Sequence, residues 1–184
     1  MNWSISTTEH PEKAYHAFCA SWELSGASDL SALAKKVSDG TVVCSPNLVL
    51  GWKHLDLLLT QAISCWERGL LFARRRSIDL LMRLTCRAQI DDATAASGIR
   101  DADRVAAFGI APVEADLQTE MNKIQEYLGS GAVRRDELLE SNQDKVARYL
   151  NYFETCFPRS LLQTDQADIV PLLIERASLL LLSK

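Results

Sequence analysis

The sequence predicts an α/β (α+β) fold in which six or seven helices flank a small central β-sheet, within a single domain spanning residues 1–184. Three observations favour this class. Hydrophobic residues make up 47% of the 184 residues, which suits one domain with an unaided core. Apolar residues recur mostly at helical spacing. The few strand-like runs are short and almost continuously apolar, which is typical of strands that helices cover on both faces.

The first half of the chain carries three helical patterns. Apolar residues fall three or four apart over Trp52–Trp66, and Gly69 ends this helix. A second helix is expected from about Ala73 to Arg83 or beyond. A shorter amphipathic segment follows over Ala88–Ser97 and ends at Gly98.

The best-defined helix lies in the second half. It begins at Pro112, whose fixed φ suits a first helical turn, and it ends before Gly129. Val113, Leu117, Met121, Ile124 and Leu128 form its apolar stripe. Helical patterns return over Arg134–Glu140, Gln143–Thr155 and about Asp165–Arg176.

Strand signals are fewer and short. They cover Asn2–Thr7, Thr41–Cys44, Val105–Ile110 and Ala177–Leu182. None alternates cleanly between apolar and polar residues, so we expect a small sheet between helices.

Charge and composition exclude several classes of protein. The net charge of −4 argues against polyanion binding by the whole surface, so any nucleic-acid site must be local. The chain shows no membrane-spanning stretch and no signal-peptide pattern, which predicts a cytoplasmic location. The five cysteines are widely spaced, which favours buried reduced thiols over a zinc site or a disulfide framework.

Motifs for catalysis are missing. The histidines at positions 10, 16 and 54 sit in no recognisable catalytic frame, and the common esterase, zinc-protease and nucleotide-binding motifs are absent. The acidic pairs Asp91-Asp92 and Asp101 with Asp103 are interpreted as solvated surface rather than as a cation site. No cofactor or metal is therefore expected.

One local cluster opposes the negative net charge. Residues 68–87 contain six arginines and a single acid, Asp79. If the second helix continues, Arg76, Arg83 and Arg87 lie in one row on its outer face, beside Lys53 and His54 of the preceding helix. The cluster is open to two interpretations: a solvated charged face, or a surface that binds phosphates and bases. Trp66 is expected in the core, whereas Trp52 precedes the apolar register and is expected to be partly exposed.

Residues 50–99 also carry a family resemblance. A Gly, a charged residue and His-Leu open one helix, a second Gly precedes Ala-Arg, an acid precedes three aliphatic residues, and Gln-Ile precedes Gly-Ile. These motifs are Gly51-Trp52-Lys53-His54-Leu55, Gly69 with Ala73-Arg74, Asp79-Leu80-Leu81-Met82, Gln89-Ile90 and Gly98-Ile99. In this order, and with the ending Glu175-Arg176, they resemble the regulatory subunit of the archaeal KEOPS complex, the family of the PRPK-binding protein (TPRKB).

The resemblance covers nearly the whole chain, residues 1–50 only in outline, and it has two departures. Cys86 and Ala88 stand where the family usually has Gly and Arg before Gln-Ile, and Arg83 replaces a common tyrosine. These changes affect the expected nucleic-acid contacts rather than the fold.

The resemblance implies a non-catalytic subunit of the complex that attaches threonylcarbamoyl to an adenosine of tRNA. The implied partners are the PRPK-like kinase of the KEOPS complex and the 3′ CCA end of tRNA, with no membrane and no small-molecule substrate. The residues expected to bind tRNA are Lys53, His54, Arg74, Arg75, Arg76, Arg87, Gln89 and Ile90. Two alternatives stay open: a purely structural kinase-docking protein without RNA binding, and a small enzyme acting on a nucleotide or acyl substrate.

Overall fold

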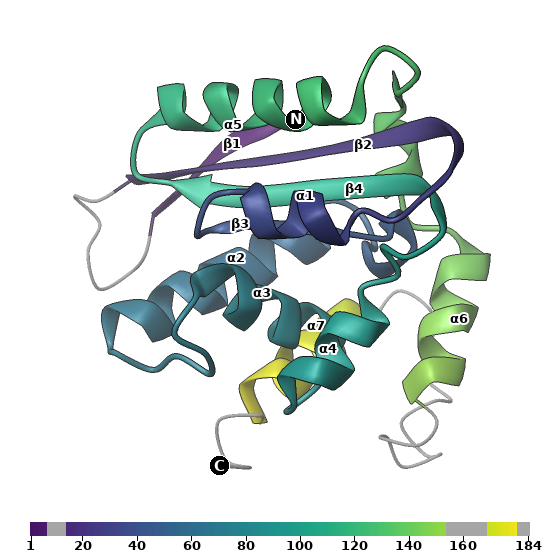
Figure 1. Ribbon diagram of the computed structural model, residues 1–184. Coiled ribbons are helices and arrows are strands. Elements are labelled where there is room, and N and C mark those ends of the chain that lie inside the picture. Colours follow the sequence, from purple (N-terminus) through teal and green to yellow (C-terminus); the bar gives the residue numbers. More distant parts are fainter. Residues whose placement is uncertain (7–13, 154–168, 180–184) are drawn as a thin grey trace.

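A computed structural model describes residues 1–6, 14–153 and 169–179 of the chain. It is an α+β structure in which a small antiparallel sheet lies between helices (Figure 1), so the predicted fold class is confirmed.

The sheet has five strands in the described residues, in the order β1-β2-β4-β3, with β5 pairing Trp22 and Glu23 of β2. Every pairing is antiparallel. The strands are β1 (Asn2–Ser6), β2 (Ala14–Ser28), β3 (Thr41–Cys44), β4 (Ala102–Ala111) and β5 (Val133–Arg134). The long strands β2 and β4 therefore form the centre.

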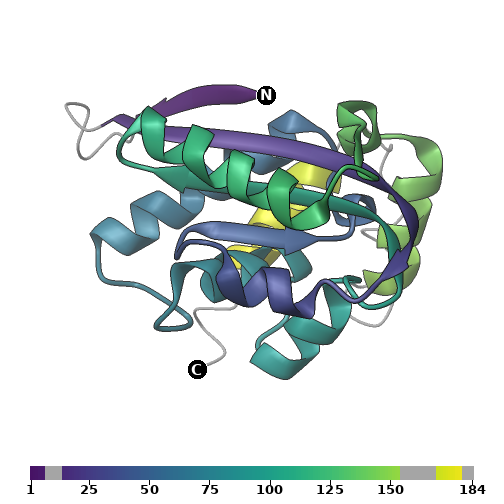
Figure 2. The same ribbon diagram turned by 45° about the horizontal axis from the view of Figure 1, so that its top comes forward.

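Helices cover both faces of this sheet. Figure 1 shows α5 above the sheet and α2 and α3 below it, and Figure 2 shows α5 lying along β2 and β4 from another direction. The helices are α1 (Ser31–Lys36), α2 (Trp52–Glu67), α3 (Arg76–Thr85), α4 (Ile90–Ala96), α5 (Glu114–Leu128), α6 (Gln143–Phe153) and α7 (Ile169–Leu179), with 3₁₀ turns at Pro46–Leu48 and Asp136–Leu139.

The alternation of side chains along β4 produces two cores. Ala106 and Phe108 face one side and pack with leucines of α2 and α3. Val105 and Ala107 face the other side and pack with α1 and α5. Because both faces of β4 are buried, its sequence is a nearly continuous apolar run, and the prediction that helices cover such a strand on both faces is confirmed.

A third, smaller cluster joins α6 and α7 to the end of α3. Tyr149 is its centre, and its hydroxyl lies 2.7 Å from the Leu48 carbonyl oxygen and 3.2 Å from that of Leu84. The cluster consists of Leu50, Cys86, Val146, Tyr149, Ile169, Leu173 and Ala177.

Several predicted boundaries need correction. The second helix begins at Arg76 rather than Ala73, so Arg74 and Arg75 precede it. The strand predicted over Ala177–Leu182 is wrong over residues 177–179, which close α7. Residues 7, 154–155, 165–168 and 180–182 of the predicted elements lie outside the described residues. Strand β2 and helix α1 were not predicted from the sequence.

The described cysteines are free thiols, as expected. Cys19, Cys44 and Cys86 are buried and Cys65 is half-buried, while Cys156 lies outside the described residues. In the described part of the chain, no helix has both the length and the apolar character needed to cross a bilayer.

The pairing of β3 with β4 depends on Gly109, which lies opposite Thr41. A Cβ added there would lie 2.6 Å from the Gly40 carbonyl oxygen and 2.8 Å from Thr41 Oγ1. Because backbone cannot yield as a flexible side chain does, we expect Gly109→Ala to lower the free energy of unfolding by about 1 to 3 kcal/mol. Urea denaturation measures this. Gly26→Ala is the matched control, since nothing lies within 4 Å of its added Cβ, and equal stability of the two variants would contradict the steric account.

Candidate nucleic-acid interface

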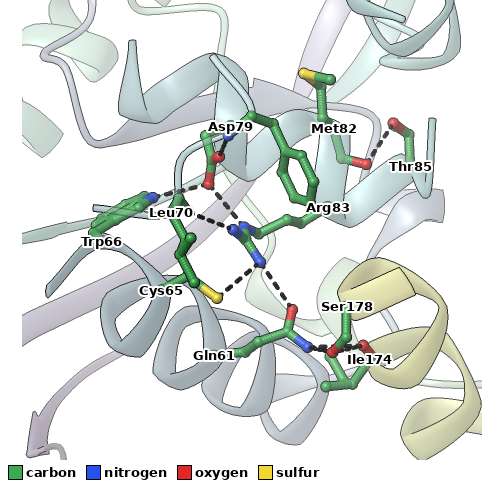
Figure 3. Close-up of polar contacts among 11 residues, drawn as sticks. Gln61, Cys65, Trp66, Leu70, Asp79, Met82, Arg83, Thr85, Ile174 and Ser178 are labelled. Carbon is green, nitrogen blue, oxygen red and sulfur yellow. Dashed lines mark hydrogen bonds and ion pairs between the residues drawn. The ribbon is translucent and has the colours of Figure 1, made fainter. Parts of the chain in front are cut away.

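The predicted row of outward-facing arginines is wrong at Arg83. Both Arg83 and its partner Asp79 are fully buried, and Arg83 Nε donates a hydrogen bond to Asp79 Oδ2 at 2.7 Å. Asp79 and Arg83 of the polar arc therefore point into the protein (Figure 3). Helical spacing places these residues in one row, but it does not say which way the row faces.

The Asp79–Arg83 pair is the centre of a hydrogen-bond network (Figure 3). Asp79 accepts hydrogen bonds from the Trp66 indole N–H at 2.8 Å and from the Phe72 backbone N–H at 2.5 Å. Arg83 donates to Gln61 Oε1 at 3.3 Å, and to the carbonyl oxygen of Leu70 at 3.4 Å. The pair thus joins α2, α3 and the connection between them.

The network continues into α7. The Gln61 amide nitrogen donates to the Ile174 carbonyl oxygen at 2.8 Å and to the Ser178 hydroxyl. The Arg83 guanidinium also lies 4.5 Å from the centroid of the Phe72 ring. This arginine holds helices together and offers no contact to a ligand.

Removing one member of this pair leaves an uncompensated buried charge. We therefore expect Arg83→Met to lower the free energy of unfolding by about 3 to 5 kcal/mol. The control is Arg104→Met, because the Arg104–Glu23 pair is 52% and 43% exposed and spans 3.6 Å, so its loss costs less than about 1 kcal/mol. Chemical denaturation compares the two, and a small effect at Arg83 would refute its role in stability.

Arg74, Arg75 and Arg76 stay together on the surface at the start of α3. The Arg76 guanidinium carbon lies 5.1 Å from the centroid of the Trp66 ring, and Arg75 Nε lies 3.8 Å from Asp39 Oδ1. Trp66 is buried, as predicted. Two of the three arginines are thus engaged with neighbouring side chains, while all three remain exposed.

His54 does not lie on the surface as the tRNA-binding prediction requires. It is 1% exposed, and its Nδ1 accepts a hydrogen bond from the Leu50 backbone N–H at 3.2 Å. Burial, with a smaller contribution from the charge of Lys145, lowers the pKa of His54 to about 4. A neutral imidazole inside the protein stabilises the entry to α2 and offers no charge to RNA.

The buried imidazole predicts acid sensitivity. The pKa of His54 is 6.5 in the unfolded chain and about 4 in the folded protein. As the pH falls, the imidazole is therefore protonated in the unfolded chain before it is protonated in the folded protein. Stability that is complete above pH 6.5 falls by about 3 kcal/mol as the pH drops to 4. His54→Asn keeps an acceptor for Leu50 and should remove this pH dependence in denaturation measured from pH 7 to 4. His16→Asn on β2 is the matched control; an unchanged profile in His54→Asn would count against the account.

Lys53 and Trp52 lie exposed in the first turn of α2, and Trp52 is 56% exposed. Gly51 precedes the helix with a φ of 86°, a conformation that favours glycine, and no side chain caps this end. The backbone N–H groups of the first turn and the helix dipole together favour an anion here. The predicted partial exposure of Trp52 is confirmed, and the cation Lys53 is its neighbour in the sequence.

A cavity of about 560 Å³ adjoins Trp52 and is mostly apolar. Leu139 of the 3₁₀ segment η2 (Asp136–Leu139) forms part of its wall, and the acidic residues Asp136, Glu137 and Glu140 also line it. These residues lie more than eighty positions from Trp52 in the sequence. No sequence signal pointed to them, because only the fold brings the η2 segment to the start of α2.

The remaining candidates lie at the other end of α3. Cys86 ends this helix in the left-handed region with a φ of 50°. Arg87 is half-buried, whereas Gln89 and Ile90 are exposed at the start of α4.

The eight predicted residues therefore do not form one patch. Trp66, which Arg76 contacts, is thirteen residues along α2 from Lys53, about 20 Å at the rise of an α-helix. Lys53 lies with Trp52 at the start of α2, and Arg74–Arg76 form a second group at the start of α3. Gln89 and Ile90 form a third group at the start of α4. Within the described ranges, no three His, Cys, Asp or Glu side chains gather as a metal site would require.

The fold and this surface define an α+β protein with an exposed aromatic and cation pair at an uncapped helix N-terminus. No protein-family model matches the chain, and no curated protein matches it.

Proposed function

We propose that the protein is a non-catalytic, cytoplasmic subunit of the KEOPS tRNA threonylcarbamoyladenosine modification complex that binds the 3′ CCA end of tRNA. The observation that carries RNA binding is the exposed Trp52 beside Lys53, next to the 560 Å³ cavity at the start of α2. Docking on the PRPK-like kinase rests on the family resemblance of residues 50–99.

The chemistry of the cavity suits unstacked bases. An exposed indole face and an apolar wall support base stacking, which contributes about 1 to 3 kcal/mol per base. Cytosine and adenine both carry an exocyclic amino group, and carboxylates such as those of Glu137 and Glu140 accept hydrogen bonds from it. The acidic lining, unfavourable to phosphate, thus favours the base edges of a CCA sequence.

Phosphates of the same strand have a separate binding position. Lys53 and the uncapped N–H groups lie at the N-terminus of α2 and not among the acidic residues that line the cavity. With one phosphate neutralised by Lys53, the slope of log affinity against log salt is expected to be about −0.7.

The test compares intact tRNA with tRNA lacking its CCA in fluorescence polarisation. We expect CCA removal, Trp52→Ala and Lys53→Ala each to weaken binding, with about a tenfold loss for Trp52→Ala from lost stacking. Tyr127→Ala and Lys123→Ala, on exposed residues of α5, are the matched controls. Equal affinity for the two tRNAs would refute end binding, and normal binding by Trp52→Ala would refute this site.

The alternative, a purely structural kinase-docking protein, is favoured by the internal use of the arginines. Arg83 is buried with Asp79, and Arg76 lies against Trp66. Co-purification with the kinase and no measurable tRNA binding would select this alternative.

A further inference from the structure

A second cavity of about 460 Å³ lies at a different place, between the start of β4 and the start of α6. Figure 1 shows α6 and the connection from α4 to β4 at the same end of the molecule. The cavity lining is almost entirely polar, unlike that of the cavity beside Trp52. Its charged lining residues are Arg100, Asp101, Asp103, Arg104, Asp144, Lys145 and Arg148.

The charged groups of this cavity are not paired with one another. Seven charged residues line it, all in the described part of the chain, and no ion pair within 4.0 Å joins any two of them. Arg104 pairs with Glu23, which is not a lining residue, at 3.6 Å. Arg100 and Arg148 form no ion pair with any described residue. Cations and carboxylates that converge without neutralising each other leave their hydrogen-bonding capacity for a ligand.

Lys145 fixes one wall of the cavity. It is 6% exposed, and its Nζ donates to the carbonyl oxygens of Val49 at 3.0 Å and Leu138 at 2.5 Å. The side chain of Asn142 accepts a hydrogen bond from the Lys145 backbone N–H at 2.9 Å, which holds the first turn of α6. Arg148 and Asp144 project from this anchored helix, so the site stands on a rigid element.

We propose that this cavity binds a small phosphorylated polyol, that is, a sugar phosphate. Arg100 and Arg148 form no ion pair with any described residue, and guanidinium groups bind phosphate through two parallel hydrogen bonds. The carboxylates of Asp101, Asp103 and Asp144 accept from hydroxyl groups. The scarcity of apolar lining excludes a stacked base or a hydrophobic ligand, and the volume is in the range of small-molecule sites.

Isothermal titration calorimetry on the full chain tests the proposal with ribose 5-phosphate, inorganic phosphate and ribose as probes. Ribose 5-phosphate should bind about ten times more tightly than either of the others, because only it uses both kinds of group. Arg148→Gln should weaken both phosphate-containing probes about tenfold, and Asp144→Asn should weaken ribose 5-phosphate and ribose but not inorganic phosphate. Lys123→Gln on α5 is the control and should bind like the unchanged protein.

Four results would overturn all or part of the proposal. The first is no binding of ribose 5-phosphate up to about 10 mM, and the second is normal binding by Arg148→Gln. The third is that Arg148→Gln loses tRNA binding while the unchanged protein does not bind ribose 5-phosphate. This result would assign Arg100 and Arg148 to the binding of an RNA backbone. Equal affinity for phosphate and ribose 5-phosphate would overturn the polyol part. The Trp52 variants do not touch this cavity, so the two proposals fail independently.

Discussion

The packing beneath the sheet depends on one buried ion pair, Asp79 with Arg83. Two charges removed from water are stable only when their hydrogen-bonding capacity is filled, and here the carboxylate accepts from Trp66 and Phe72 while the guanidinium donates to Gln61 and Leu70. These partners come from α2 and from the connection to α3. The requirement to satisfy the pair therefore specifies how α2, α3 and α7 meet, which hydrophobic contact alone leaves less defined.

The sequence predicts most helices because an amphipathic helix repeats with a period that alternatives do not share. The stripe from Leu117 to Leu128 predicts α5 in this way, and Gly129, with a φ of 76°, ends it as expected. Strand β2 escaped prediction although it is central. Its core segment runs Ala17-Phe18-Cys19-Ala20 without alternation, because helices cover both of its faces. The same ambiguity of short apolar runs explains why the end of α7 read as a strand.

The candidate site could be predicted only in part. The exposure of Trp52 was predicted because it precedes the apolar register of α2, and Lys53 was chosen because it begins the same helix and belongs to the family motif. His54 and Arg83 were misplaced because polar residues inside a protein look like surface residues in a sequence; only their partners, Leu50 and Asp79, explain their burial. Glu140 and Arg148 were not found at all, since their cavities unite segments distant along the chain.

The outer strands of the sheet have a consequence for assembly. The edge formed by β3 is four residues long and pairs Ala106–Gly109 of β4, while β1 and β5 pair residues 14–18 and 22–23 of β2 at the opposite edge. Short edge strands offer few unpaired backbone N–H and C=O groups, so a strand added from another chain would form few hydrogen bonds here. Association of this protein with other macromolecules is thereby directed to its helical surfaces and hollows, and self-templated fibre growth through the sheet is disfavoured.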